Sequence, residues 1–326
     1  MRVGIVGAGM AGLACAGLLV EQGHAVQLFD KGRGPGGRMS SRRMETPAGI
    51  AIFDHGAQYF TARDPGFASQ VGEWEAAGVV ARWPDARDDA WVGVPAMNAI
   101  PRHMAYGLNI VSNAHVRGIA RGADGWHLAC EQGGEGQFDA LVIALPAEQA
   151  APLLGLYCLD MARIAVRVLS APCWAAMLTF EGQVDCSAVI RDNGIVAWAA
   201  RNNSKAGRAG PEAWTIHATP EWSRTHLEES PEWVAQALSN AFLGASGADR
   251  PPLAAIAHRW RFALSGTAGR EALWDSASRL GVCGDWLIGP RVEAAWLSGR
   301  RLAQIILSDG ASSLCDQPMA RSSGVA

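Results

Sequence analysis

The sequence predicts an α/β protein in which a parallel sheet is interrupted by a second unit with its own mixed sheet. The first observation is residues 2–30, where a β-branched apolar run, a helical segment and a second apolar run follow one another. Two further buried runs, 139–146 and 280–285, lie far downstream and return the chain to the first sheet. The third observation is that ten of the 13 tryptophans fall within 61–102 and 156–275, which lie outside that sheet.

These observations divide the chain into two interleaved units. We expect the first unit to comprise 1–60, 103–155 and 276–308, and the second to comprise 61–102 and 156–275. Residues 309–326 are small, polar and without pattern, so they are expected to form a disordered tail.

A glycine motif joins the first strand to the first helix. Gly7 permits a tight turn, Gly9 lets backbone N–H groups approach a pyrophosphate, and Gly12 lets the helix pack close to the strand. Met10 and Ala11 complete the motif at the helix start, where unpaired N–H groups and the positive dipole end favour phosphate. Asp30 ends the second strand, where a carboxylate accepts hydrogen bonds from an adenosine ribose. The first unit is therefore predicted to be a Rossmann-like, dinucleotide-binding domain.

The segment after Asp30 is rich in glycine and contains basic residues. Composition alone favours a flexible surface loop for 31–41, but its position after the ribose acid favours a second wall of the nucleotide site. Glycines allow close approach there, and Arg38 is placed to neutralise the pyrophosphate.

The remaining elements follow from periodicity and turn residues. A helix over 65–77 places Phe67, Val71 and Trp74 on one face, 81–90 is a polar loop, and a short helix covers 97–106. Between this helix and the run at 139–146, the expected strands are 109–111, 115–120 and 126–130. In the second unit the expected strands are 175–180, 188–190, 195–199, 213–218 and 253–257, and the expected helices are 220–227 and 231–243, each with proline near its start. A final helix covers 291–307.

Composition limits the classes of partner and cofactor. The net charge is −3 and 18% of residues are charged, so neither nucleic acid nor an anionic membrane is expected as a partner. Apart from the glycine-containing start, no stretch is long and apolar enough to span a bilayer. The seven cysteines are scattered without C-x-x-C spacing, which is typical of reduced thiols and argues against a metal site. A cytoplasmic location is therefore expected.

Several motifs together resemble the amine-oxidase-type flavoproteins. These are Gly7 to Gly12, Asp30 and the Gly36-Gly37-Arg38 turn. The blocks 53–64, 198–205 and 283–286 narrow the resemblance to the bacterial renalase branch, over nearly the whole chain to about Leu307. The resemblance implies non-covalent FAD, since no cysteine follows the Gly284-Asp285 region closely. The FAD-binding residues that it implies are Gly7, Gly9, Met10, Ala11, Gly12, Asp30, Lys31, Arg38, Met39, Gly56, Ala57, Val116, Gly284, Asp285 and Val292.

The substrate wall is expected beside the flavin ring. The candidates are Ala57, Gln58, Tyr59, Phe60, Thr61, Cys173, Trp198 and Arg291. No nucleophile and base are paired by spacing, and each of the eight histidines, including His217 and His258, is interpreted as a core residue. The flavin itself is expected to carry the chemistry, so no catalytic side chain is assigned.

The renalase branch implies an oxidase of wrongly reduced dihydro-NAD(P) isomers, with O2 as acceptor and NAD(P)+ and hydrogen peroxide as products. Two alternatives remain. The first is an amine oxidase acting on a monoamine or polyamine, a class that generally has an aromatic cage and a lysine near the flavin. Only Lys205 is available for this role, and its polar surroundings are interpreted as an exposed loop. The second is a non-catalytic FAD-binding module, which the aromatic-rich second unit disfavours.

Overall fold

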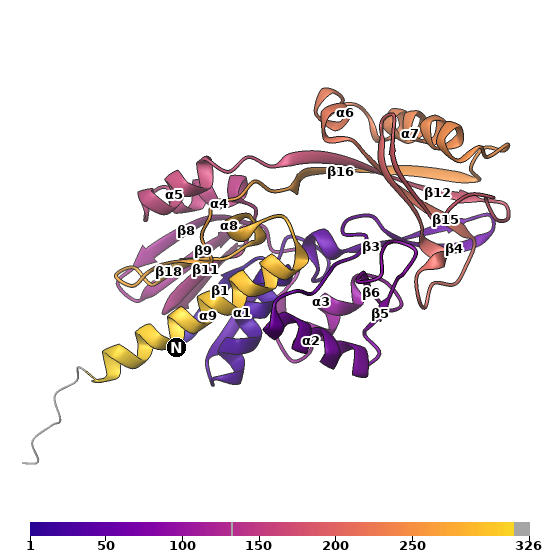
Figure 1. Ribbon diagram of the computed structural model, residues 1–326. Helices are drawn as coiled ribbons and strands as arrows, with labels where there is room; N and C mark the ends of the chain where they lie inside the picture. Colours follow the sequence, from indigo (N-terminus) through magenta and orange to yellow (C-terminus); the bar gives the residue numbers. More distant parts are fainter. Residues whose placement is uncertain (132, 316–326) are drawn as a thin grey trace, which may run out of the picture.

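A six-stranded sheet forms the centre of the first unit in the computed structural model, which describes residues 1–131 and 133–315 (Figure 1). The sheet order is β17-β18-β11-β1-β2-β7. Five strands run parallel, and β17 pairs antiparallel at one edge. Their bounds are β1 Arg2–Val6, β2 Ala25–Phe29, β7 Asn109–Val111, β11 Ala140–Ile143, β17 Leu273–Asp275 and β18 Leu280–Val282. The predicted α/β class and Rossmann-like sheet are confirmed.

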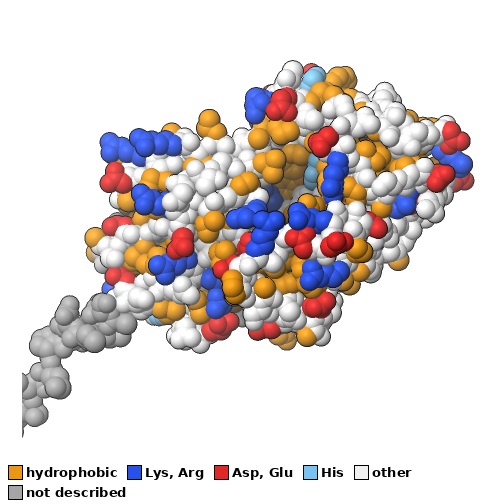
Figure 2. Space-filling model, viewed as in Figure 1, with side chains coloured by type: hydrophobic (Ala, Val, Ile, Leu, Met, Phe, Trp, Pro, Cys, Tyr) orange, Lys and Arg blue, Asp and Glu red, His pale blue; other side chains and the backbone are white. Residues whose placement is uncertain are grey.

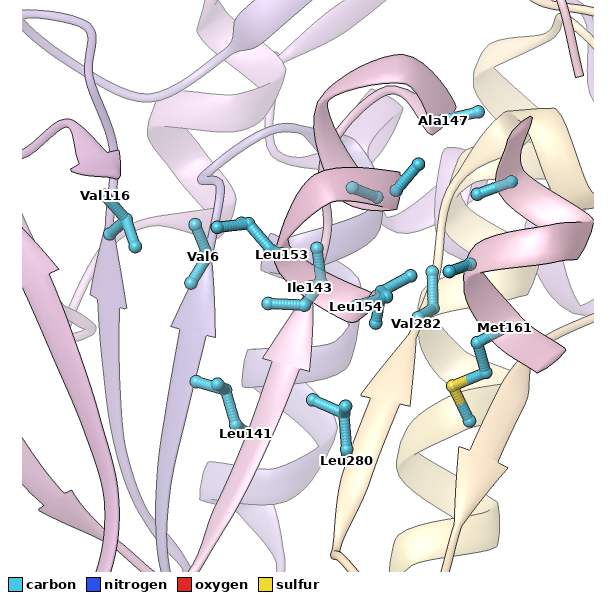
Figure 3. Close-up of a cluster of buried hydrophobic side chains, with 14 of the residues drawn as sticks. Val6, Val116, Leu141, Ile143, Ala147, Leu153, Leu154, Met161, Leu280 and Val282 are labelled. Atoms are coloured by element: carbon cyan, nitrogen blue, oxygen red, sulfur yellow. The ribbon is translucent and has the colours of Figure 1, made fainter. Parts of the chain in front are cut away.

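Both faces of this sheet are buried, so its strands read as continuous apolar runs. Along β11, Ala140 and Val142 face the helices α1 (Met10–Glu21) and α9 (Val292–Cys315). Leu141 and Ile143 face the opposite side, where α4 (Ala147–Leu154) and α5 (Leu159–Val166) pack. Figure 3 shows Leu141, Ile143, Leu280 and Val282 beside Leu154 and Met161 of these helices. A small antiparallel sheet of β8 Val116–Gly122, β9 Gly125–Cys130 and β10 Gly133–Phe138 covers the same side.

Glycines set two close backbone contacts around α1. A Cβ added to Gly12 would lie 2.0 Å from the carbonyl oxygen of Gly7, so only glycine permits this contact between the motif turn and the helix. A Cβ added to Gly299 would lie 2.1 Å from the carbonyl oxygen of Ala11, because α9 crosses directly over the start of α1. The last helix therefore packs tightly on the first.

The second unit is a five-stranded sheet in the order β13-β14-β15-β12-β16. Its strands are β12 Ala171–Phe180, β13 Val189–Asn193, β14 Val196–Arg201, β15 Glu212–Ala218 and β16 Ala254–Leu264, and α6 Pro220–Thr225 and α7 Pro231–Ser246 lie on one side of it (Figure 1). Every described pairing in it is antiparallel, where the sequence predicted a mixed sheet. A short turn joins β13 to β14, whereas β16 returns through α6 and α7 and still pairs antiparallel with β12 at the edge of the sheet.

Residues 37–104 connect the two units. The hairpin of β3 Ser41–Thr46 and β4 Gly49–Asp54 packs Ala51 and Phe53 against Met177 and Ala213 of the second sheet. After it come α2 Pro65–Ala76, β5 Val80–Arg82, β6 Trp91–Gly93 and α3 Ala99–Met104, and a short turn of helix at Gly37–Met39 precedes it. As predicted, α2 buries Phe67, Val71 and Trp74.

Three predicted boundaries change. The boundary at 155/156 separates α4 from α5, yet both helices share one core with Leu280 and Val282. The boundary at 276 excludes β17, which belongs to the first sheet. The predicted tail from 309 is wrong over its first residues, because α9 continues to Cys315 and Asp309 accepts a hydrogen bond from the indole of Trp274 at 3.1 Å. The rest of that tail, 316–326, lies outside the described residues.

Candidate functional site

A cavity of about 2590 Å³ lies between the two units. It is well above the roughly 300–1,000 Å³ of pockets for drug-sized ligands, so it has room for a dinucleotide and a second molecule. Figure 2 shows the hollow on one face, with lysine and arginine side chains along its edge. Every site residue predicted from the sequence lines this cavity except Gly12, whose role is the close contact with Gly7. The structure thus brings together residues from positions 7 to 292.

The start of α1 forms one wall of the cavity. Gly9 is the N-cap residue, no described side chain caps the helix, and its first turn contains no acidic residue. A Cβ added to Gly9 would meet no protein atom within 4 Å, so the open side of the helix start faces free space. Backbone N–H groups at such an end bind phosphate.

Asp30 is held rigidly at the edge of this wall. Its two carboxylate oxygens accept hydrogen bonds from the backbone N–H of Ala8 and of Gly32, each at 2.7 Å. Each oxygen retains a further lone pair, which is available to a ribose hydroxyl. Val116, which the resemblance implies as an FAD-binding residue, lines the same cavity.

Replacing Asp30 by alanine is expected to weaken FAD binding about tenfold to a hundredfold, because hydrogen bonds to a carboxylate contribute roughly 1.5–3 kcal/mol. FAD titration of the apoprotein measures this change. The free energy of unfolding of the variant apoprotein is measured alongside. An unchanged value shows that the weaker binding comes from the lost hydrogen bonds to FAD and not from unfolding of the segment around Asp30. An unchanged dissociation constant for FAD would place the nucleotide elsewhere.

Arg38 and Asp285 form an ion pair on the cavity wall. The guanidinium donates to Oδ1 of Asp285 at 2.6 Å and to the carbonyl oxygen of Ala263 at 3.1 Å. Ser265 donates to the other carboxylate oxygen at 3.3 Å. Two residues predicted to bind the cofactor therefore fix each other, and they connect the glycine-rich segment to the C-terminal one.

The start of α9 closes the cavity from the other side. Arg291 and Val292 line the wall, so the positive end of the α9 dipole faces the cavity. The carboxylate of Glu293 accepts hydrogen bonds from the backbone N–H of Arg63 at 2.6 Å and of Asp64 at 2.8 Å. This helix start is therefore tied to the segment that follows Thr61.

The predicted substrate wall is aromatic. The rings of Tyr59 and Trp198 lie 5.6 Å apart, and Trp83 lies behind them, 6.3 Å from Tyr59. The Arg191 guanidinium lies 4.7 Å from the centre of a Trp198 ring. Cys173 also lines the cavity, but burial raises the pKa of its thiol to about 12, so it is neither a thiolate nor a nucleophile at neutral pH.

The interpretation of Lys205 as an exposed residue is wrong. Its ammonium is fully buried, 3.2 Å from Oδ2 of Asp54 and 3.2 Å from Oε1 of Gln58. The polar residues around it are bonded inward, since Asn202 accepts from the backbone N–H of Asp54 at 3.1 Å and donates to Thr215 at 3.0 Å. A polar sequence can thus occupy the interior when each group finds a partner there.

The side chain of Gln58 stabilises the cavity wall through hydrogen bonds. Its Oε1 accepts from Lys205, which has only donors, and its Nε2 donates to the carbonyl oxygens of Asp54 and Gly56. These three bonds fix the amide orientation and fold residues 54–58 into a tight turn. Although Gln58 lines the cavity, its amide is therefore already hydrogen-bonded to other groups of the protein.

The charge of Asp54 holds this turn to the second unit. Its carboxylate also pairs with Arg208 and accepts from the backbone N–H of Met97 at 2.8 Å. Burial by itself would raise the pKa of Asp54, but Lys205 and Arg208 lower it to about 2. Burial lowers the pKa of Lys205 to about 8, against the attraction of Asp54. Both pKa values fall, but the fall favours the charged form of Asp54, which faces two cations, and the neutral form of Lys205, which shares one carboxylate with Arg208.

Four histidines line the cavity: His55, His115, His217 and His258, none of which was predicted from the sequence to be a site residue. The rings of His55 and His258 lie 4.9 Å apart, and His258 lies 4.5 Å from Trp260. Burial lowers the pKa of His55 to about 3 and that of His217 to about 4, and it also lowers the pKa of His258. All three rings are therefore neutral at pH 7. The alternation of aromatic and basic residues over 258–262 is the sequence pattern that could have indicated this wall.

Cations dominate the cavity lining, with 12 lysines and arginines against three acids. All three acids are engaged: Asp30 by backbone N–H groups, Asp285 by Arg38, and Glu148 by Ser170. Five of the arginines have carboxylate partners. Among the described residues, seven of the cations have no ion pair: Lys31, Arg33, Arg42, Arg43, Arg63, Arg102 and Arg291.

Neither a metal site nor a membrane-spanning helix is seen within 1–131 and 133–315. No group of three or more histidine, cysteine or acidic side chains is arranged to hold a metal ion there. None of the helices described is long and apolar enough to cross a membrane.

Comparisons with known proteins agree with this arrangement. Residues 5–70 match the NAD(P)-binding Rossmann-like domain, and residues 84–307 match the flavin-containing amine oxidoreductases. A stretch of 44 residues is 48% identical to the zeta-carotene-forming phytoene desaturase of Myxococcus xanthus, and it covers 14% of this chain and only 8% of that protein.

Solved structures share the fold over nearly the whole chain. A protein assigned as a protoporphyrinogen oxidase, from Exiguobacterium sp. 255-15, superimposes with a TM-score of 0.74 at 12% identity, covering 94% of this chain and 99% of that one. Cyclohexylamine oxidase from Brevibacterium oxydans IH-35A gives 0.71 at 13% identity, covering 95% and 99%. A double mutant of putrescine oxidase gives 0.70 at 12% identity, covering 94% and 99%. At these identities the similarity is one of fold.

Proposed function

The chain belongs to the flavin-containing amine oxidoreductase family, and from this premise we propose that it is an FAD-dependent oxidase of dihydronicotinamide dinucleotides. The proposed substrates are the aberrant 2- or 6-dihydro isomers of NAD(P). In the overall reaction, dihydro-NAD(P), O2 and a proton give NAD(P)+ and hydrogen peroxide.

The lining of the cavity suits FAD. The uncapped start of α1 offers N–H groups to the pyrophosphate and Asp30 offers acceptors to the ribose. Asp285 lines the same cavity, and the resemblance assigns it to the ribityl chain of FAD. When bound, FAD supplies a ring that accepts hydride and passes the electrons to oxygen. Of the described cysteines only Cys173 lines the cavity, and it is a protonated thiol, which supports non-covalent binding.

The excess of unpaired cations is the observation that carries the choice of substrate. A pyrophosphate-containing substrate is attracted by seven cations without ion pairs, even after the two negative charges of FAD are counted. A protonated amine would be repelled by the same wall, and each of the three acids there already has partners.

The protein contributes orientation more than proton transfer. The Tyr59 and Trp198 rings supply flat apolar surfaces for a nicotinamide, and Arg291 supplies a cation for its carboxamide or phosphate. A dihydronicotinamide already has a hydride to donate, so stacking in the correct geometry removes most of the entropic cost of transfer. This substrate requires no general base.

The test is anaerobic mixing of the FAD-loaded protein with a panel of donors while flavin absorbance is followed. Fast bleaching is expected with 2- or 6-dihydro-NAD(P), little with ordinary 4-dihydro-NAD(P)H, and none with simple amines. Arg291→Ala is expected to slow the reduction while the flavin stays bound. Bleaching by a monoamine or polyamine that is faster than by every dihydronicotinamide would refute the proposal.

The second candidate is an amine oxidase, and buried Lys205 is the observation that favours it. Its ammonium donates a hydrogen bond to Gln58, which lines the cavity, and the Tyr59–Trp198 pair supplies aromatic faces. An amine must lose its ammonium proton before hydride transfer, so its reductive rate would rise steeply with pH. The same panel, run at several pH values, separates the two candidates.

A further inference from the structure

A ledge of aromatic rings lies on the cavity wall outside the predicted FAD contacts. It consists of His55, His258 and Trp260, and its rings meet at centroid distances of 4.5–5.1 Å. His55 follows β4, whereas His258 and Trp260 lie on the second half of β16, which extends beyond its predicted end at 257. The ledge borders the flavin wall, since a Cβ added to Gly56 would lie 3.4 Å from the Trp260 ring.

Backbone hydrogen bonds fix the ledge in place. The carbonyl oxygen of His55 accepts from the Trp260 indole at 2.8 Å and faces Nε2 of His217 at 3.2 Å. Because the ring orientations are set before any ligand arrives, a planar ligand loses little free energy to the ordering of this wall. Burial lowers the pKa of both His55 and His258, so the two histidine rings of the ledge are neutral at pH 7 and offer aromatic rather than cationic surface.

One arginine, Arg42, lies beside the ledge. Arg42 on β3 lies close enough that its charge adds to burial in lowering the pKa of both His55 and His258. It has no ion pair among the described residues, whereas Arg259 and Arg261 are held in place by Glu228 at 2.8 and 2.6 Å. The carboxylate of Asp54, whose charge also acts on His55, is buried and paired with Lys205 and Arg208.

We propose that the ledge and Arg42 bind the adenosine diphosphate part of a nucleotide, as a second site distinct from the one at Asp30 and Val116. His258 meets both other rings edge-on, so a purine would stack on a single ring face of the ledge, and the Arg42 guanidinium beside it would pair with a pyrophosphate. This inference rests on the proposed function, in which that part is the tail of the dinucleotide substrate. The ledge then makes the protein select dinucleotides over mononucleotides.

The test uses ADP as the probe on the FAD-loaded protein. Calorimetry measures ADP binding while flavin absorbance verifies that FAD is not displaced. We expect wild-type protein to bind ADP, Arg42→Ala to weaken binding about threefold to tenfold, and His258→Ala to weaken it by about fivefold or more. Arg167→Ala is the matched control, since it removes an exposed arginine on the end of α5 that does not line the cavity, and it is expected to change nothing.

Steady-state kinetics provide the second readout. Arg42→Ala is expected to raise KM for the reactive dihydro-NAD isomer with kcat unchanged, and to leave KM for the corresponding mononucleotide unchanged. Absence of ADP binding to the FAD-loaded wild type, or equal binding by Arg42→Ala, overturns the second site. Failure of every dihydronicotinamide to bleach the flavin refutes the proposed function instead, and Arg42-dependent ADP binding measured in the same protein would still support the site.

Discussion

Replacing Asp54 by alanine is expected to lower the free energy of unfolding by about 3–5 kcal/mol, the cost of leaving buried charge without its partner. The carboxylate holds Lys205 at 3.2 Å, pairs with Arg208 and accepts the Met97 N–H at 2.8 Å. Removing it leaves two cations facing each other in a region without solvent. The turn that places Gln58 and Tyr59 in the cavity wall is built on this carboxylate, so the variant is also expected to bind FAD poorly.

Urea unfolding of the FAD-saturated protein, followed by tryptophan fluorescence, measures this loss. Asp160→Ala is the matched control, because it removes an exposed carboxylate paired with Arg163 and should change stability little. The pKa of Asp54 is about 2 in the folded protein against 3.8 as the reference value, so its stabilisation is present above pH 4 and is lost as the pH falls through about 2. A variant as stable as wild type at pH 7 would show that the network contributes nothing to the fold.

Gly12→Ala is expected to destabilise the protein by about 1–3 kcal/mol and to weaken FAD binding on the order of a hundredfold. The new methyl group would lie 2.0 Å from the Gly7 carbonyl oxygen, so α1 must move away from the motif turn. That movement carries the N–H groups of the helix start out of line with the pyrophosphate. Unfolding curves and FAD titrations measure the two effects.

Substitutions at two other glycines of this region distinguish a loss of helix packing from a loss of cofactor binding. A methyl group on Gly17, inside α1, meets no atom within 4 Å, so Gly17→Ala should stabilise the helix by about 0.5–1 kcal/mol. A methyl group on Gly9 also meets no protein atom, but it enters the space in front of the helix start. Gly9→Ala should therefore weaken FAD binding with a smaller loss of stability than Gly12→Ala. The reverse ranking would contradict the assigned glycine roles.

Local patterns were sufficient for much of the fold. The strand–helix–strand start, the face of α2 formed by Phe67, Val71 and Trp74, and the proline-led helices α6 and α7 are confirmed because short-range periodicity and turn residues define them. The Gly-x-Gly spacing located the start of α1, since that chemistry lies within six consecutive residues. The roles of the predicted site residues remain predictions, although all except Gly12 line one cavity.

The features that sequence patterns missed depend on contacts between residues that lie far apart in the chain. Lys205 lies in a polar stretch that reads as a surface loop, and its burial depends on Asp54, 151 positions earlier. His258 and Trp260 extend β16 beyond its apolar half because Trp174 and Cys173 of β12 continue the pairing. The helix α9 runs past its expected end because Asp309 bonds to Trp274.

The close crossing of α9 over α1 has a consequence for biosynthesis. The Rossmann-like sheet needs β18, and the glycine-bearing start of α1 is covered by a helix that begins at Val292. A nascent chain cannot assemble this sheet until the segment from β18 to α9 leaves the ribosome, and contacts between such distant positions form slowly. Chains released early would expose the apolar faces of β1 and β11 and become substrates for chaperones and proteases. FAD capture is therefore expected only after α9 has left the ribosome, which makes cofactor loading a check that this segment has been made.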